Sequence, residues 1–277
     1  MLTIILAFLA ATLTWRGDYY GFEGRQWGWA TLAGFAGFIA VALPITWLIR
    51  KRMEMIFNAV QGKIISSQEQ LRRKILALQN KMQSGPKFQA QIEKEQADSI
   101  REAIKMLDEL KPIQKWNLLV LRQYNTFKGQ MLFQIKDFEE AAPLLDKALV
   151  LEPLTLAMQM VLMYKKGDVK KLEKAFYKGT GRFKDEKGTL LYALYSWVLV
   201  AENRISEAVA ILDEGRKKCE SEVLQQNWDH LVNGRTKRFS NAALGEQWYA
   251  LYLENPPQQK MKAQTAFGGK ISRGGFR

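Results

Sequence analysis

Residues Lys136–Pro153 read KDFEEAAPLLDKALVLEP. Apolar residues recur in this stretch every three or four positions, which predicts an amphipathic helix, and the closing proline is expected to stop that helix. The same chain opens with MLTIILAFLAATLTW at Met1–Trp15 and carries GWATLAGFAGFIAVALPITWLI at 28–49. A helix of soluble type in a chain with two long apolar runs predicts an all-α protein with a membrane anchor and a water-exposed body.

Composition narrows the classes of function. The chain has 277 residues, enough for one or two domains, and a formal net charge of +13. This charge favours anionic partners such as acidic lipid, RNA or acidic proteins, although cytoplasmic domains of inner-membrane proteins are often basic without such partners. Cys219 and His230 are single residues of their types. An internal disulfide and a cysteine-rich metal site are therefore excluded, and no cofactor is expected.

The second apolar run predicts a transmembrane helix. Trp29–Ile49 contains 21 residues without a charged side chain, which is about the length that crosses a hydrocarbon core of about 30 Å. Trp27 and Trp47 lie near its two ends, where indole rings favour the headgroup level. Pro44 would break a soluble helix but is tolerated in a membrane helix. Small residues spaced four apart also allow self-association. The alternative is a buried core helix.

The first run, Met1–Trp15, is shorter than a usual span. It lacks the basic residues that precede the apolar core of a signal peptide, which favours an uncleaved first span. A cleaved signal peptide and a segment that lies on the membrane surface are the alternatives. The predicted membrane anchor therefore covers residues 1–49, with two apolar spans and a short external loop at 16–27.

The charges beside these spans predict the orientation. The link Arg16–Gln26 is neutral overall, whereas Arg50, Lys51 and Arg52 directly follow the second span. Basic flanks stay on the cytoplasmic side of a membrane. We therefore expect a multi-pass protein of the bacterial inner (plasma) membrane, with its C-terminal domain in the cytoplasm.

Residues 50–112 are predicted to form a basic amphipathic linker. Two sets of apolar residues recur at spacings of mostly three and four, as they do in coiled coils. The first set is Val60, Ile64, Leu71, Ile75, Leu78 and Met82, and the second is Phe88, Ile92, Ile100, Ile104, Leu107 and Leu110. Ser84-Gly85-Pro86 separates them, and Lys111-Pro112 is expected to close the second helix. A helical hairpin is the first interpretation, and a stalk that pairs with another protomer is the alternative.

Residues 113–257 are predicted to form a helical repeat domain, and its first repeat is marked by small and apolar residues at fixed spacings. At offsets 0, 3, 8, 9, 12, 16, 19 and 24 stand Gly129, Leu132, Asp137, Phe138, Ala141, Leu145, Ala148 and Pro153. This spacing resembles the tetratricopeptide repeat (TPR), a helix–turn–helix unit of about 34 residues. The resemblance implies that Gly129, Ala141 and Ala148 are small where helices touch, and that the closing proline stops the second helix. Asn125 and Lys128 replace the family's tryptophan and leucine, so the match is partial.

Two further units follow the first. The later one keeps the same register, with Asn203 in the turn and Gly215 as the second small residue; its register residues are Tyr192, Tyr195, Leu199, Ile205, Ala208 and Leu212. A degenerate unit lies between the first unit and this later one, with Gly167-Asp168 as its turn and Phe176 in its core. About three units over 121–215 predict an α-solenoid, with SEVLQQNWDHLVNG and NAALGEQWYALYLENPP as capping helices. An ordinary helical bundle is the alternative.

The order of the parts resembles that of the HemY-type inner-membrane proteins. Two apolar spans, a short external loop and an arginine-rich flank precede the repeats, and the likeness covers residues 1–60 and, loosely, the repeat body. It implies an association with late tetrapyrrole synthesis. It carries no functional residue over to this chain.

Catalytic patterns are absent from the sequence. His230 follows Asp229, but a base oriented by an acid also needs a nucleophile, and Cys219 lies eleven residues away with nothing to indicate reactivity. The glycine pairs near the C-terminus do not stand between a strand and a helix, which excludes a phosphate-binding loop. The chain is therefore predicted not to be an enzyme.

The last segment, 258–277, is predicted to be a flexible basic tail. Its cations have no acidic residue among them: Lys260, Lys262, Lys270, Arg273 and Arg277. The ending ISRGGFR resembles the arginine–glycine segments that bind RNA. A disordered soluble end, a contact with anionic lipid, and a contact with RNA or an acidic partner all stay open.

Together these features favour a non-enzymatic, membrane-anchored scaffold that binds a partner protein through a TPR-like groove on the cytoplasmic face. The sequence does not indicate which protein that is. One alternative is a membrane tether for RNA, a ribosome or anionic lipid through the basic linker and tail. The other is a tetrapyrrole-pathway factor of the HemY kind.

Overall fold

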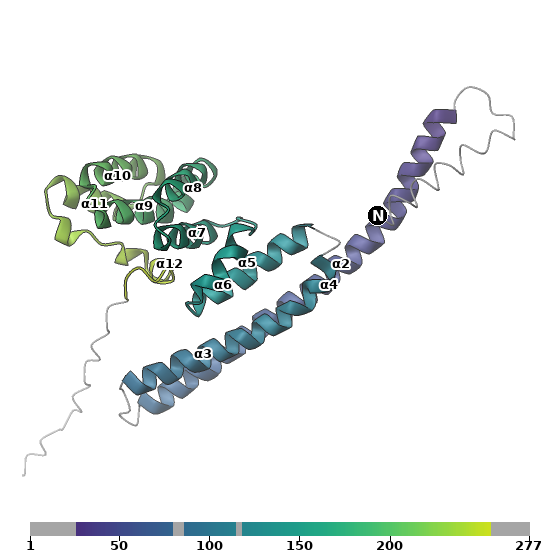
Figure 1. The fold of residues 1–277 in the computed structure, drawn as a ribbon, viewed down its shortest axis with the longest axis horizontal. Coiled ribbons are helices and arrows are strands. Elements are labelled where there is room, and N and C mark those ends of the chain that lie inside the picture. Colours follow the sequence, from purple (N-terminus) through teal and green to yellow (C-terminus); the bar gives the residue numbers. More distant parts are fainter. Residues whose placement is uncertain (1–25, 80–85, 115–117, 256–277) are drawn as a thin grey trace, which may run out of the picture. The chain divides into compact units, whose positions relative to one another are not determined.

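The computed structural model describes residues 26–79, 86–114 and 118–255 (Figure 1). Every regular element in these ranges is a helix, which confirms the predicted all-α class. The helices fall into two compact units, the first ending at Gly167 and the second beginning at Asp168. The predicted span Met1–Trp15, residues 16–25 of the predicted loop 16–27, and the tail 258–277 lie outside the described residues, and the last two residues of that loop belong to the first described helix.

The first unit begins with one long helix, α2 (Gln26–Gln79), which runs from the apolar span into the basic linker without a break. The predicted boundary after residue 49 is therefore a change of composition within a single helix. Pro44 lies inside it, as expected for a membrane helix. The Thr46 hydroxyl donates to the carbonyls of Ala42 (2.8 Å) and Leu43 (2.9 Å), so it needs no partner outside the helix.

Helix α3 (Pro86–Leu107) returns along α2. Lys63 pairs with Glu102 at 2.8 Å and Lys74 pairs with Glu95 at 2.8 Å. Residue numbers rise along α2 as they fall along α3, so the two helices are antiparallel and form the expected hairpin. Buried apolar residues lie between them and at the end of α3: Val60, Ile100, Ala103, Ile104, Leu107 and Leu110.

Helical turns continue past the end of α3. The chain passes into η2 (Asp108–Leu110) and α4 (Lys111–Gln114), so Lys111-Pro112 does not end the helical path as predicted. A proline in the first turn removes no backbone hydrogen bond, because the N–H groups of that turn have no partner within the helix. Next comes α5 (Leu118–Gln134), and its Phe127 ring lies 4.6 Å from the ring of Phe57 on α2.

Helix α6 (Phe138–Asp146) packs against α5, and α7 (Pro153–Lys165) completes the first unit. The Asp137 carboxylate caps α6 by accepting from the backbone N–H of Glu140. The role predicted for Pro153 is wrong, since α6 has already ended at Asp146 and Pro153 opens α7. Its fixed φ and its missing N–H suit the first position of a helix as well as the position after one.

The second unit contains α8 (Val169–Arg182), η3 (Asp185–Gly188), α9 (Thr189–Ala201), α10 (Ile205–Cys219) and α11 (Glu222–Val232). Helix α11 corresponds to the first predicted capping helix. The short turn η4 (Thr236–Arg238) follows α11, and the second predicted cap forms two short helical elements in place of one helix: η5 (Ala242–Leu244) and α12 (Glu246–Tyr249). Gly245 has a φ of +63°, outside the helical region, and it separates η5 from α12.

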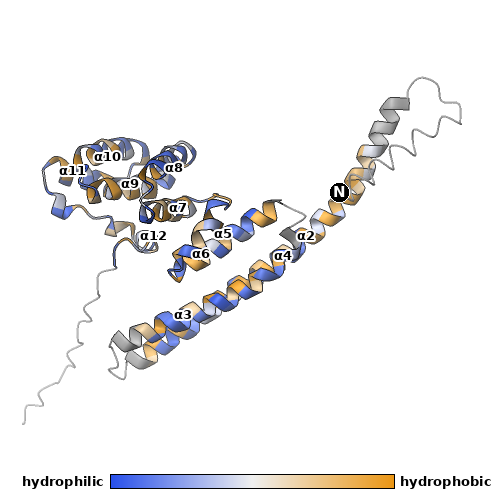
Figure 2. Ribbon diagram, in the orientation of Figure 1, coloured by the Kyte–Doolittle hydropathy of each residue, from blue (hydrophilic) through white to orange (hydrophobic). Residues whose placement is uncertain are grey.

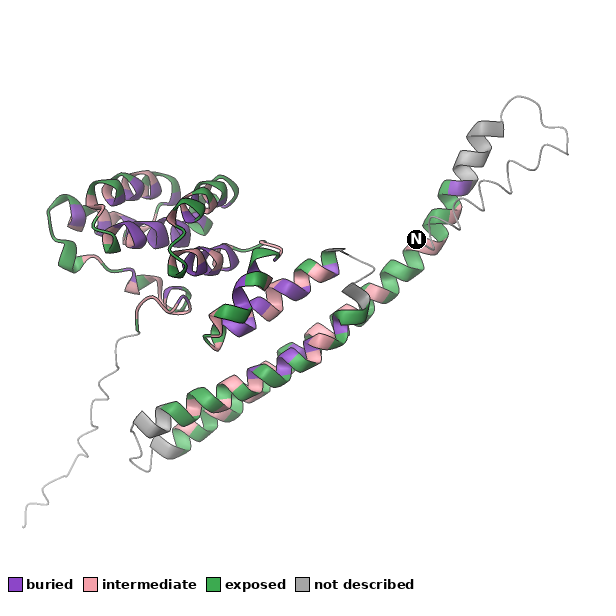
Figure 3. Ribbon diagram, in the orientation of Figure 1, coloured by how far each residue is buried: buried purple, intermediate pink, exposed green. Residues whose placement is uncertain are grey.

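Helix α9 forms the core of the second unit (Figure 3). Ten of its 13 residues are buried, among them Tyr192, Leu194 and Val198. Burial raises the pKa of the Tyr195 phenol to about 12, so that this ring stays neutral at physiological pH. The remaining helices of the unit are amphipathic and cover α9.

Candidate functional site

The exposed part of α2 is the first candidate site. We call residues 34–48 the apolar stretch; in it Phe35, Leu43 and Trp47 are at least 60% exposed. Only 6% of the most apolar 18-residue window of this helix is buried. Among the described residues, α2 is the helix that is long and apolar enough to cross a membrane, and Figure 2 shows the hydrophobic colouring along this part of it. An exposed apolar surface of this length is unfavourable in water and suits a bilayer.

Charged residues follow this stretch within one turn. The Lys51 ammonium lies 5.1 Å from the centre of the Trp47 ring, and Arg50 pairs with Glu54 at 3.1 Å. Arg50, Lys51 and Arg52 are all exposed. An indole beside a lysine at an apolar–polar boundary is the arrangement that favours the headgroup level of a bilayer. The structure thus brings the predicted basic flank and Trp47 together on α2.

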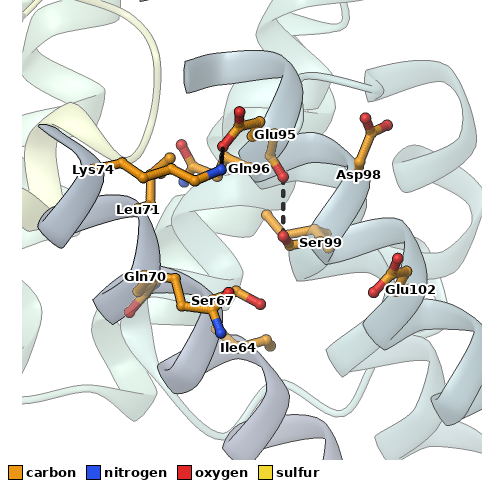
Figure 4. A pocket seen from close by; sticks show the side chains of 12 residues that line it. Ile64, Ser67, Gln70, Leu71, Lys74, Glu95, Gln96, Asp98, Ser99 and Glu102 are labelled. Atoms are coloured by element: carbon orange, nitrogen blue, oxygen red, sulfur yellow. Dashed lines mark hydrogen bonds and ion pairs between the residues drawn. The ribbon is translucent and has the colours of Figure 1, made fainter. Parts of the chain in front are cut away.

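A groove between α2 and α3 is the second candidate (Figure 4). It encloses about 230 Å³ and is lined by Ile64, Leu71, Lys74, Glu95, Ser99 and Glu102, with further polar residues. Sites for small ligands are typically about 300–1,000 Å³ and mostly apolar. This groove is smaller, and its charged groups already have partners, since Lys74 bonds to Glu95 and Lys63 pairs with Glu102. These ion pairs hold α2 and α3 together, and they leave the groove poorly suited to binding a ligand.

The residues predicted to pack the repeats lie between helices. Buried are Gly129, Leu132, Ala141, Leu145, Ala148, Tyr195, Ala208 and Leu212; half-buried are Phe138, Pro153 and Ile205. A Cβ on Gly129 would lie 2.7 Å from Cγ of Leu145, so α5 and α6 meet where only glycine fits. A Cβ on Gly215 would lie 2.8 Å from Cγ of Tyr192, which gives α9 and α10 the same kind of contact.

One polar cluster was not expected from the sequence. The Asp108 carboxylate accepts from the Tyr124 hydroxyl at 2.6 Å and from the ammonium groups of Lys128 (3.0 Å) and Lys111 (2.7 Å). Burial raises the pKa of this carboxyl, but these three donors outweigh burial, and the pKa lies below its ordinary value. Asp108 and Lys128 stand 20 residues apart, so no local pattern indicates the pair. The cluster joins the end of the hairpin to α5.

A second unexpected contact closes the described part of the second unit. The two oxygens of Glu254 accept from the indole N–H groups of Trp197 (2.7 Å) and Trp248 (2.9 Å). This carboxylate therefore fixes the segment after α12 to α9. The contact gives both indole N–H groups a hydrogen-bond acceptor, so its role is structural.

Cys219 and His230 are the two residues that the sequence analysis considered for catalysis. Cys219 is buried at the end of α10, and burial raises the pKa of its thiol, so little of the reactive thiolate is present at neutral pH. His230 is half-buried on α11. Within the described residues, no group of three or more His, Cys, Asp or Glu side chains is placed to hold a metal ion.

No protein-family model, no curated protein and no solved structure matches this chain. The resemblances to TPR units and to HemY-type proteins therefore stay predictions.

Proposed function

We propose that this chain is a non-enzymatic scaffold of the bacterial inner membrane, held by apolar spans, whose cytoplasmic body binds a partner protein through TPR-like helix pairs. The observation that carries the proposal is the exposure of the apolar stretch on α2. The same helix continues into the packed hairpin. An anchor and a folded body therefore share one continuous helix.

The charges support the cytoplasmic orientation. Arg50, Lys51 and Arg52 are exposed directly after the apolar stretch, and basic residues in this position stay inside. A second span at Met1–Trp15 makes the anchor multi-pass in this proposal.

The close helix pairs support a repeat scaffold. Both α5–α6 and α9–α10 meet at a glycine that leaves no room for a Cβ, as small residues do in stacked helix–turn–helix units. Stacks of such units bind peptides or helices on the concave surface that the stack forms. The partner is a protein whose identity stays open, and a second copy of this chain is one candidate.

Two measurements test the proposal. A periplasm-dependent phosphatase fused after Arg277 should be inactive, and its activity would contradict the cytoplasmic orientation. Partners should be cross-linked in membranes, purified with the full chain in mild detergent, and compared with those of Gly215→Leu, which forces α9 and α10 apart. Gly181→Ala is the matched control, because a Cβ there meets no atom within 4 Å. Partners retained by Gly215→Leu would contradict binding through the helix pairs.

A membrane tether for RNA, a ribosome or anionic lipid is the second candidate, favoured by the exposed flank Arg50–Arg52 and the net charge of +13. The salt dependence separates the two. Contacts to phosphate weaken steeply as salt rises, whereas an apolar contact between helices does not.

A further inference from the structure

Helix α8 presents a row of cations on one side. Lys170, Lys174, Lys178 and Arg182 stand one helical turn apart, and all four are exposed. We call this set the cationic stripe. At a rise of 1.5 Å per residue it extends over roughly 18 Å. Figure 2 colours most of α8 as hydrophilic.

The opposite side of α8 fixes the direction of the stripe. Leu172, Phe176 and Gly179 are buried, and the Phe176 ring lies 4.4 Å from the ring of Tyr195 and 5.2 Å from that of Tyr192 on α9. The helix therefore cannot turn its cations inward. Tyr177 lies on the stripe side and is 52% exposed.

None of the four cations forms an ion pair with an acidic residue of the described part of the chain. The contrast is α10, where Arg216 and Lys217 pair with Asp213, and Lys218 pairs with Glu214. Like charges four residues apart destabilise a helix. An external anion that lies along the row would relieve this repulsion.

We propose that the cationic stripe binds the anionic lipid headgroups of the membrane that holds α2. This inference rests on the membrane anchoring proposed above. Lysine and arginine are attracted to anionic headgroups, and a half-exposed tyrosine beside them favours the same level. Anchoring keeps the second unit near lipid, which raises the effective concentration of headgroups, whereas RNA has to be recruited from solution.

The test uses the full chain in nanodiscs, with a fluorescent label on α8. Gly181→Cys supplies the labelling site, because a Cβ at Gly181 has open space around it. Cys219 is buried, so the chain without this substitution should take up no label. A quencher attached to the lipid headgroup reports whether α8 touches the bilayer. Nanodiscs of phosphatidylcholine are compared with nanodiscs that also contain phosphatidylglycerol.

Quenching is expected with phosphatidylglycerol and is expected to fall as salt rises from about 0.1 to 1 M, because the screening length drops from about 10 to 3 Å. Replacing all four stripe residues by Gln should remove at least about half of it. The control variant Lys217→Gln, Lys218→Gln, Arg235→Gln, Lys237→Gln loses the same charge from other parts of the unit and should keep the quenching.

Three results would overturn the proposal. They are equal quenching with and without phosphatidylglycerol, equal loss in the stripe and control variants, and unchanged quenching in a stripe variant that has lost co-purifying RNA. The last result would assign the stripe to nucleic acid. A separate carbonate wash of membranes distinguishes failure of the anchor. A chain that resists the wash but shows no quenching overturns the stripe alone, whereas a chain that is released overturns the anchoring and the inference built on it.

Discussion

Two helices of this protein are almost equally apolar and have opposite surroundings. The apolar stretch of α2 and the whole of α9 (TLLYALYSWVLVA) both lack charged residues. Yet large side chains such as Phe35 and Leu43 are exposed on α2, whereas ten residues of α9 are buried. Length and flanks explain the difference better than hydrophobicity does. The 13 residues of α9 rise only about 20 Å, which is too short for a bilayer core of about 30 Å, whereas the uncharged run Trp29–Ile49 that contains the apolar stretch has 21 residues and rises about 32 Å.

The neighbours of each helix complete the comparison. Helix α9 is covered by Phe176 of α8, by α10 at Gly215, and by Asn241, whose amide donates to the Ala193 carbonyl at 3.0 Å. The Ser196 hydroxyl bonds to the same carbonyl within the helix. Within the described residues no such cover lies over the apolar stretch of α2. Helix α9 is thus apolar because it forms a protein core, whereas the apolar stretch of α2 suits a lipid environment.

The largest expected effect comes from charging the exposed helix. In a chain without Met1–Trp15, Phe38→Lys with Leu43→Lys should release the chain from membranes at alkaline carbonate, because each change costs about 3–4 kcal/mol of insertion free energy, or about 6–8 in total. The shortening, which the control variant shares, removes the first proposed span, which would otherwise hold the chain by itself. Helix content measured by circular dichroism should change little, because both side chains are exposed.

Phe38→Leu with Leu43→Phe is the matched control and should stay in the membrane fraction. Retention of the lysine variant after the carbonate wash would mean that this stretch does not span a bilayer, and the comparison with α9 would lose its basis.

The same change in α9 should have the converse effect. Leu194 is fully buried, so Leu194→Lys places a charge without a partner in the core and should lower the free energy of unfolding by about 3–5 kcal/mol. Urea unfolding of the full chain in detergent, followed by tryptophan fluorescence, measures it. Ala201→Lys, at the exposed end of the same helix, should stay within about 0.5 kcal/mol. Equal effects at both positions would show that α9 is not the core.

Two glycine substitutions, one on α10 and one on α8, test how closely α10 packs on α9. Gly215→Ala places a methyl group 2.8 Å from Cγ of Tyr192 and should destabilise the second unit by about 1–3 kcal/mol. Gly181→Ala meets no atom within 4 Å on α8 and should stabilise it by about 0.5–1 kcal/mol. Thermal melting of both variants reports the sign. A stabilising Gly215→Ala would mean that α10 lies farther from α9 than this contact implies.

The parts of the fold that sequence reasoning predicted rest on local signals. The uncharged run before Arg50 and the apolar periodicity around Ile100 and Leu107 suffice for a membrane-length helix and for a hairpin, because each pattern lies within one element. Pro153 was misassigned because a proline fits the start of a helix as well as the position after one. The last predicted capping helix is interrupted at Gly245, because this residue has a positive φ. The periodicity of apolar residues gives no sign of such a backbone conformation.

Contacts between distant residues were beyond sequence reasoning. The bonds from Tyr124 and Lys128 to Asp108 and from Trp197 to Glu254 join residues 16 to 57 positions apart. The spacing of the four cations of α8 was visible in the sequence, but their lack of acidic partners was not. The assignment of the helix pairs to TPR units depends on register over several units, and it stays a prediction.

The smallest expected effect concerns the polar cluster that holds the packed end of the hairpin on α5. The native pKa of Asp108 lies below the ordinary value of 3.8, so its carboxylate stabilises the fold fully above about pH 5, and this contribution is lost as pH falls through the native pKa. Asp108→Asn should cost about 1 kcal/mol at neutral pH, since the amide accepts weaker hydrogen bonds from Tyr124 and Lys128. The difference from the unsubstituted chain should shrink on acidification, measured by urea unfolding between pH 7 and about pH 3.

Glu109→Gln, at the exposed neighbouring position, should stay within about 0.5 kcal/mol at neutral pH. A difference for Asp108→Asn that grew as pH fell would mean that the carboxyl stabilises the fold as a protonated donor, and the cluster would then not be held by its cations.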